Sequence, residues 1–295
     1  MSHIYGIILM FLAACSFGAS AILIKLAYHS GLQPAALLPL QNLVAVVCLW
    51  PMMLIPRGLP RLKGQQVRGL IWQGLAGNFA ISVCYFWAAQ RIDVSLLSII
   101  LFAYPGLVLL YQIVVERHRA ATWELMALAL AFAGVVCAVD PFHGAAARVD
   151  RLGLILSVGA AVAYAFMNLY GQKLARDMSS LVITTFTSTV STVALMAVLP
   201  PRHWFTLAFT PGQWLFIVGL ALFSTVIPMN LMYPAIRRIG AFHASVVSIA
   251  ELPCILVLAY FILSERMNHW QMLGGGMILL SLVLMQPARD AAGSR

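Results

Sequence analysis

Charged side chains are scarce in this chain of 295 residues. Asp, Glu, Lys and Arg make up only 9% of it, whereas soluble proteins carry about 25%. The scarcity excludes an ordinary cytosolic enzyme, a disordered chain and a nucleic-acid-binding protein, because all three need a more polar surface in water. Hydrophobic residues fill 62% of the chain instead, and the mean hydropathy is +0.93. The composition therefore predicts an integral membrane protein.

Motifs for ATP and metal chemistry are also missing. The sequence contains no Walker lysine loop, no His-Glu-x-x-His motif and no cysteine cluster, so we expect no cofactor and no metal. A membrane enzyme needs several ionisable groups at one depth, and a channel needs a repeated pore motif or a charged ring. Neither pattern is present in the sequence, and we expect a protein that is not an enzyme.

The cysteines are few and unpaired. Five lie inside apolar runs, without the spacing of a metal site, at positions 15, 48, 84, 137 and 254. Residues 12–15 resemble the cleavage box of a bacterial lipoprotein, but no Lys or Arg precedes them, as a signal peptide requires. We expect the cysteines to pack between helices and the first apolar segment to be retained as a helix.

Long apolar runs predict the fold. A helix needs about 20 apolar residues to cross the hydrocarbon core, and turn sequences at 29–34 and 210–212 divide two of the longest runs. We predict an all-α integral membrane protein with ten transmembrane helices. The predicted spans are 4–24, 34–55, 69–90, 94–115, 123–139, 152–172, 180–199, 213–233, 241–263 and 270–286.

The basic residues predict the orientation. Lys and Arg number 18 against 9 Asp and Glu, a surplus that in so apolar a chain indicates loop charge. With both termini in the cytoplasm, 12 of the 18 lie on the inner side and 6 on the outer side. Because basic loops stay on the cytoplasmic side, we predict cytoplasmic N and C termini.

The chain contains an internal repeat. Lys25 and Lys173 follow the first and sixth predicted spans, 148 residues apart. Pro105 and Pro253 lie near the middle of the fourth and ninth spans, again 148 apart. Nearly the same offset relates Glu116-Arg117 to Glu265-Arg266 and Trp123 to Trp270. We predict two repeats of five helices, residues 1–145 and 146–295.

The odd number of helices in each repeat has a geometric consequence. The second copy must enter the membrane upside down relative to the first. Inverted repeats are typical of transporters, because two antiparallel copies can exchange conformations around a site at the midplane. The alternative is a duplicated scaffold without a transport role.

Several short motifs occur in the same order in both halves. The first half opens with Phe17-Gly18 before Lys25, followed by Gly31-Leu32-Gln33-Pro34. It closes with Tyr104-Pro105 before Glu116-Arg117 and Gly134. The second half closes in the same way, with Glu251-Leu252-Pro253 before Ser264-Glu265-Arg266 and Gly274. This set resembles the EamA repeat of the drug/metabolite transporter superfamily. The resemblance implies a ten-helix exporter of small organic metabolites in the bacterial inner membrane. Gln41 and Ala165 stand where the family commonly has an Arg and an aromatic residue, which leaves subfamily and substrate open.

Glu251 stands out because a carboxylate at the centre of a span costs about 2.5–3.5 kcal/mol on insertion scales. It is a candidate for proton coupling or for pairing with a substrate ammonium. The alternative is a structural carboxylate that caps the backbone freed by Pro253. Ala103 is the aligned residue in the first repeat, so the ionisable group breaks the symmetry. His243 lies two helical turns before Glu251 and is a second proton-coupling candidate, with an interfacial role as its alternative.

Amide, hydroxyl and aromatic side chains supply the remaining candidate wall. Some share helix faces, such as Asn78 with Ser82 and Tyr85. The resemblance implies large aromatic residues at the cavity positions Tyr104 and Tyr164. For each of these residues the alternative is helix packing, and Lys25 and Lys173 either reach the interface or form gates. The candidate substrate-binding residues are Asn78, Phe79, Ser82, Tyr85, Tyr104, Tyr164, Asn168, Ser188, Asn230 and Glu251.

Together these features predict a secondary active transporter that exports small organic metabolites, chiefly apolar and aromatic amino acids, by alternating access. The alternatives are uptake or exchange of a vitamin or nucleotide-like metabolite, and a membrane-embedded enzyme or lipid-handling protein. The expected partners are a small-molecule substrate and membrane lipids, with no nucleic acid and no obligate protein partner.

Overall fold

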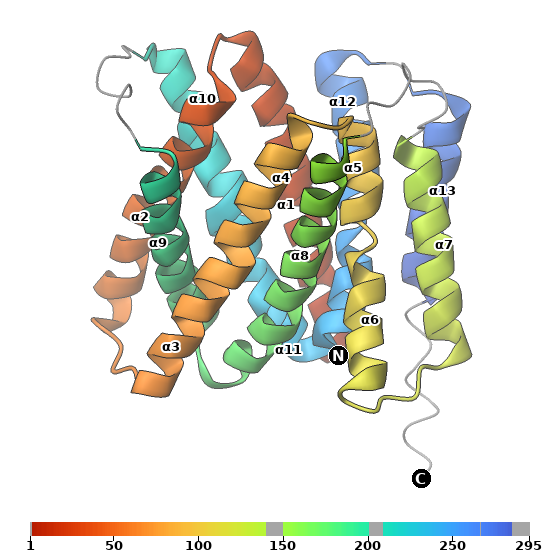
Figure 1. The fold of residues 1–295 in the computed structure, drawn as a ribbon, viewed down its shortest axis with the longest axis horizontal. Helices are drawn as coiled ribbons and strands as arrows, with labels where there is room; N and C mark the ends of the chain where they lie inside the picture. Colours follow the sequence, from red (N-terminus) through yellow and green to blue (C-terminus); the bar gives the residue numbers. More distant parts are fainter. Residues whose placement is uncertain (1, 140–149, 201–208, 266, 285–295) are drawn as a thin grey trace.

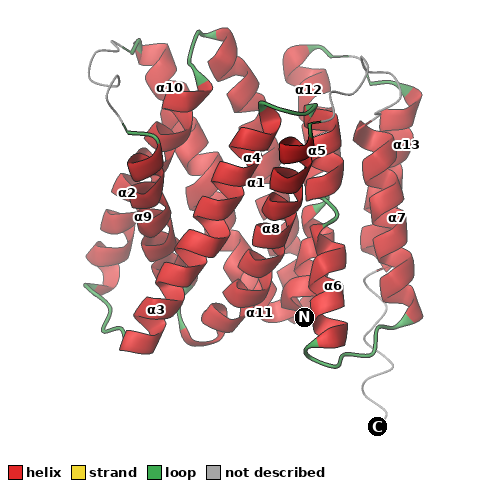
Figure 2. Ribbon diagram, in the orientation of Figure 1, coloured by secondary structure: helices red, strands yellow, loops and turns green. Residues whose placement is uncertain are grey.

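Helices form all of the regular structure in the residues that the computed structural model describes, which are 2–139, 150–200, 209–265 and 267–284. The helices stand side by side in one bundle (Figures 1 and 2). Seven helical stretches of the described chain are long and apolar enough to cross a membrane, and two shorter apolar helices accompany them. The protein is therefore a multi-pass membrane protein.

The helices fall into two successive sets, one in each half of the chain. The first set is α1 (Ser2–His29), α2 (Pro34–Arg57), α3 (Gly64–Trp72), the π-helix η1 (Gln73–Phe79), α4 (Ala80–Ala89), α5 (Val94–Leu101), α6 (Tyr104–Val114) and α7 (Thr122–Val139). The second set is α8 (Arg151–Asp177), α9 (Ser180–Val198), α10 (Pro211–Ala221), the π-helix η3 (Leu222–Val226), α11 (Ile227–Ser248), α12 (Glu251–Leu263) and α13 (His269–Leu284).

Capping residues fix where several of these helices begin. The side chain of Asp150 accepts a hydrogen bond from the backbone N–H of Gly153 at the start of α8. Thr210 and Gln213 form a reciprocal capping box at the start of α10, next to Pro211. Such caps satisfy backbone donors that have no partner within the helix.

Two helical spans are interrupted near their middle. The stretch 94–114 is divided between α5 and α6 just before Pro105, and the stretch 241–263 is divided between α11 and α12 just before Pro253. Proline has no N–H to donate, and its ring clashes with the carbonyl four residues earlier, which here belongs to Leu101 or Ile249. Each of the predicted spans 94–115 and 241–263 is therefore made of two helices on either side of a break.

The two halves run through the bundle in opposite directions. In Figure 1, α1 rises from the end marked N, whereas α8 descends toward that end. Helices of one half contact helices of the other, because α1 packs against α11 and α12, α4 against α8, and α7 against α13. At the α7–α13 contact a Cβ on Gly274 would lie 2.3 Å from the backbone nitrogen of Ala138. Only glycine allows this approach.

The number of crossings and the side of the membrane that holds the termini stay predictions. α13 ends on the side of the bundle where α1 begins (Figure 1). The predicted repeat boundary between residues 145 and 146 lies outside the described residues. So do five of the basic residues used for the orientation, which are Arg148, Arg202, Arg266, Arg289 and Arg295.

Candidate functional site

A cavity of about 340 Å³ lies between the two halves. Helices α1, α2, α4 and α5 of the first half and α8, α9, α11 and α12 of the second contribute to its wall, together with both π-helices. Extra residues in π-helical turns often mark functional sites. The position between the halves is the one that inverted-repeat transporters use for their substrates.

Glu251 brings a carboxylate to this cavity. It is the first residue of α12, directly after the break in the ninth predicted span. Its side chain is half-buried and forms no hydrogen bond or ion pair with any other described residue. Among the described residues, no Lys, Arg or His lines the cavity. The described wall therefore has one ionisable acid and no basic side chain to neutralise it.

The contacts of Glu251 distinguish its two interpretations. A structural carboxylate at this position would accept hydrogen bonds from backbone N–H groups at the break, but those of Leu252 and Cys254 already donate to the carbonyls of Ile249 and Ala250. The start of α12 has no capping hydrogen bond from a side chain. A carboxylate left without partners is more consistent with a ligand or a proton than with a cap.

Polar atoms without partners lie on the same wall. The buried Oδ1 of Asn78, Oγ of Ser188 and Oε1 of Gln41 form no hydrogen bond in the described structure. Leaving a buried polar atom unpaired costs about 1–3 kcal/mol. These atoms are free to bind a ligand or water on the cavity wall.

Tyr164 supplies the aromatic part of the wall and packs on Tyr104 behind it. The two rings stack with centroids 4.1 Å apart and planes inclined by 19°. Tyr104 is fully buried, and its hydroxyl donates to the carbonyl of Ser245 at 3.1 Å and contacts the hydroxyl of Ser248. Because Tyr104 begins α6 and Ser248 ends α11, this contact joins the two helix breaks. Tyr104 supports the wall without lining the cavity.

Six of the ten predicted substrate-binding residues line the cavity, and four do not. The six are Asn78, Ser82, Tyr85, Tyr164, Ser188 and Glu251. The other four are Phe79, Tyr104, Asn168 and Asn230, none of which is on the wall. Asn168 and Asn230 each donate their amide to the carbonyl four residues earlier, at 3.0 and 2.8 Å, so the amide NH₂ groups bond their own helices.

His243 lies away from this cavity. Its ring contacts His3 near the start of α1, at a centroid distance of 5.8 Å, and Trp123 near the start of α7, at 5.5 Å. A turn at Ile249 and Ala250 separates α11, which carries His243, from α12, which begins at Glu251. His243 is not on the cavity wall, and its role in proton coupling stays a prediction.

Further polar residues of the wall were not predicted as site residues. They are Gln41, Asn42, Ser98, Ser224 and Thr225. Gln41 carries a signal in the sequence, because it replaces a residue type common in the family. Ser224 and Thr225 lie in η3, and no sequence pattern predicts that a π-helix turns them toward the cavity.

A wider space of about 730 Å³ continues from the cavity toward one end of the bundle. The two share Gln41, Ser82 and Tyr85, and the wider space extends to Tyr28 and Gln90. These last two residues lie near the ends of α1 and α4, opposite the end marked N in Figure 1. The cavity thus communicates with that side.

Comparison with known proteins agrees with this geometry. The model of the EamA-like transporter family matches the chain twice, at residues 4–139 and 151–286. The uncharacterized transporter YcbK of Bacillus subtilis is 22% identical, with 98% of this chain and 95% of YcbK covered. An uncharacterized transporter of Archaeoglobus fulgidus is 23% identical over 70% of this chain and 72% of its own length.

A protein of known crystal structure also has the same fold. It superposes with a TM-score of 0.78 at 15% identity, and the match covers 95% of this chain and 97% of the other. At this identity the likeness shows the fold alone. The family match extends over both halves and nearly the whole sequence, and the chain therefore belongs to the EamA-like transporter family of the drug/metabolite transporter superfamily.

Proposed function

We propose that this protein is a secondary active transporter that exports apolar and aromatic amino acids across the bacterial inner membrane by alternating access. The observation that carries the proposal is the unpartnered carboxylate of Glu251 in a cavity between the two halves. In the proposed topology ten helices cross the membrane as two inverted repeats, with both termini in the cytoplasm. The protein acts as a carrier and not as an enzyme.

The chemistry of the wall suits an amino acid. The substrate ammonium pairs with Glu251, and the substrate carboxylate accepts hydrogen bonds from the amide of Asn78 and the hydroxyl of Ser188. The apolar side chain packs against Tyr164 and Phe17 on the same wall. An apolar cavity with a few convergent polar groups binds a small solute selectively.

The wider space on the side opposite the start of α1 supports the proposed route of export. In the proposed topology that side is outside the cell, so the conformation described here faces outward. The breaks between α5 and α6 and between α11 and α12 provide places where helices change direction as the two halves exchange conformations.

Competition at Glu251 gives a mechanism of coupling. The carboxylate binds either a proton or the substrate ammonium, because a protonated carboxyl has no charge to pair. A proton that binds from the outside displaces the amino acid there, and its release in the cytoplasm leaves the site free for the next substrate. Proton entry thereby drives export.

Solute counterflow in proteoliposomes tests the proposal. We expect saturable accumulation of labelled apolar and aromatic amino acids, and slower exchange when both sides are acidic, because protonated Glu251 binds no ammonium. Glu251→Gln should abolish the response to a pH gradient. Glu265→Gln is the matched control, since Glu265 is an exposed carboxylate in a surface ion pair.

Two results would count against the proposal. A folded protein that accumulates no amino acid would overturn the substrate class, and a thermal-shift screen of vitamins and nucleotides would then test the alternative solutes. A Glu251→Gln variant with the wild-type response to pH would overturn the proton-coupling role of the carboxylate.

A further inference from the structure

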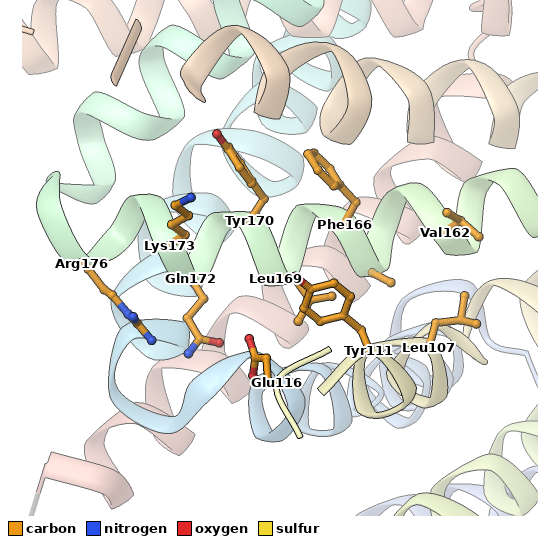
Figure 3. Close-up of a pocket in the computed structure, with 11 residues that line it drawn as sticks. Leu107, Tyr111, Glu116, Val162, Phe166, Leu169, Tyr170, Gln172, Lys173 and Arg176 are labelled. Atoms are coloured by element: carbon orange, nitrogen blue, oxygen red, sulfur yellow. The ribbon is translucent and has the colours of Figure 1, made fainter. Parts of the chain in front are cut away.

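A second hollow lies on the outer face of the bundle, between α6 and α8. It has a volume of about 620 Å³, and Figure 3 shows the residues that line it. None of these residues also lines the cavity between the halves. We call it the α6–α8 groove. Tyr111 and Val162 on its wall are 42% and 52% exposed, so the groove faces the surroundings of the bundle. In a multi-pass membrane protein those surroundings are lipid.

The groove is apolar at one end and charged at the other. Figure 3 shows Leu107, Val162 and Phe166 toward one end, with Glu116 and Arg176 toward the other. The apolar part is an extended surface of side chains from two helices. Such a surface contacts hydrocarbon without cost, whereas the charged end requires polar partners.

Three charged side chains lie at the polar end, and the described residues offer them no ion pair. Lys173 and Arg176 come from the last turns of α8, and Glu116 follows the end of α6. None of them forms an ion pair with a described residue, and the Lys173 ammonium makes a cation–π contact with the Tyr170 ring, with Nζ 5.9 Å from its centroid. Two cations and one carboxylate thus face the same groove without neutralising one another.

The equivalent place in the other half of the repeat is different. Lys25 and Glu265 hold the positions that correspond to Lys173 and Glu116, and they form an ion pair at 3.0 Å. The position that corresponds to Arg176 is Tyr28, which has no charge. A lysine and a glutamate at these repeat positions can therefore form an ion pair, as Lys25 and Glu265 do. In the α6–α8 groove the corresponding Lys173 and Glu116 form none.

We propose that the α6–α8 groove binds one membrane phospholipid whose head group carries both a phosphate and a primary ammonium. The phosphate lies between Lys173 and Arg176, which are the donors that phosphate prefers. The ammonium pairs with Glu116, and an acyl chain follows Leu107 and Phe166. The groove carries both positive and negative side chains, and these complement the phosphate and the ammonium of this head group. A groove with only a cation or only a carboxylate would complement one of the two charged groups.

The site has a structural consequence. α6 is the second half of an interrupted span, and α8 carries Tyr164 on the wall of the central cavity. A lipid that contacts both helices restrains their separation. The proposal concerns a site apart from the substrate cavity, so it stands whether or not amino acids are the transported solutes.

Native mass spectrometry of the full chain, with phospholipids of identical acyl chains, tests the site. The probes are phosphatidylethanolamine, phosphatidylcholine and phosphatidylglycerol. We expect phosphatidylethanolamine to bind about tenfold more tightly than phosphatidylcholine, whose methylated nitrogen donates no hydrogen bond to Glu116. Free phosphoethanolamine, which has no acyl chain, should not displace it, and this distinguishes a lipid from a soluble solute.

Variants separate the two parts of the head-group site. Glu116→Gln should reduce phosphatidylethanolamine binding to the level of phosphatidylcholine and leave phosphatidylcholine binding unchanged. Lys173→Gln with Arg176→Gln should weaken all three lipids. Lys25→Gln is the control, because it removes the equivalent lysine of the other half.

Three outcomes would overturn the proposal. They are equal binding of the three lipids to the wild-type chain, unchanged binding to the Lys173→Gln, Arg176→Gln protein, and a preference for phosphatidylglycerol that Glu116→Gln strengthens. The last would show an anionic-lipid site without an ammonium partner. Thermal unfolding without added lipid shows that each variant is folded, because these exposed side chains contribute little to stability.

Discussion

The two halves of the chain share a helical plan but differ in where they place charge. Lys25 meets Glu265 in an ion pair at 3.0 Å, whereas the corresponding Lys173 lies unpaired in the α6–α8 groove. Both halves have a helix break before a proline, but only the second places a carboxylate, Glu251, at the break. Duplication kept the helix breaks and changed the side chains beside them. The positions where the symmetry fails are therefore the places to look for function.

The largest expected effect comes from moving the carboxylate between the two breaks. Glu251→Ala should reduce pH-driven transport to that of protein-free vesicles, since no other described acid lines the cavity. Ala103→Glu in the same chain should not restore it, because Ala103 is not on the cavity wall. Transport into proteoliposomes under a pH gradient is measured for the Glu251→Ala variant and for the double variant. Restored transport in the double variant would show that the two breaks are interchangeable.

The next effect concerns a contact between the halves that needs close approach of two helices. Gly274→Ala places a methyl group 2.3 Å from the backbone nitrogen of Ala138. We expect a loss of about 1–3 kcal/mol in the free energy of unfolding, as for other overpacked sites. Gly276→Ala is the control on the same helix, because nothing lies within 4 Å of its added Cβ. Thermal unfolding in detergent should distinguish them, and equal midpoints would contradict the packing argument.

Sequence alone predicted the parts of the fold that depend on composition and spacing. Apolar runs and the repeat of Lys25 at Lys173 indicated a helical membrane protein made of two related halves, and the family match confirms the resemblance. Glu251 was found because a carboxylate in an apolar run is costly. These signals are local or periodic, so they need no knowledge of packing.

The finer geometry of the site could not be predicted in this way. A turn separates His243 from Glu251, and only Glu251 lines the cavity. Asn168 and Asn230 look like cavity residues by type, yet each amide bonds a carbonyl of its own helix. Which polar side chain faces a cavity depends on helix rotation and on π-helical turns, and neither leaves a clear pattern in the sequence.

The two stacked tyrosines give a smaller and more specific effect. Tyr164→Ala should change the order of preference among amino acids, because Tyr164 lines the cavity. Tyr104→Phe should slow transport several-fold with the preference unchanged, because it removes only the hydroxyl that joins the two breaks. In proteoliposomes, competition among amino acids measures the substrate preference of each variant, and initial rates measure its transport speed. A shifted preference in Tyr104→Phe would place Tyr104 in contact with the substrate.

The smallest expected effect tests the ion pair that distinguishes the halves. Lys25 and Glu265 are each about half exposed, and exposed ion pairs contribute about 0–1 kcal/mol. Lys25→Gln should therefore lower the unfolding midpoint slightly at low salt and hardly at all at 1 M salt, where charges are screened within about 3 Å. Lys173→Gln should leave the midpoint unchanged in both, since Lys173 has no described acidic partner. If Lys173→Gln destabilised the lipid-free protein as much as Lys25→Gln, the unpaired lysine would have a structural role, and the charges of the α6–α8 groove would not be held open for a ligand.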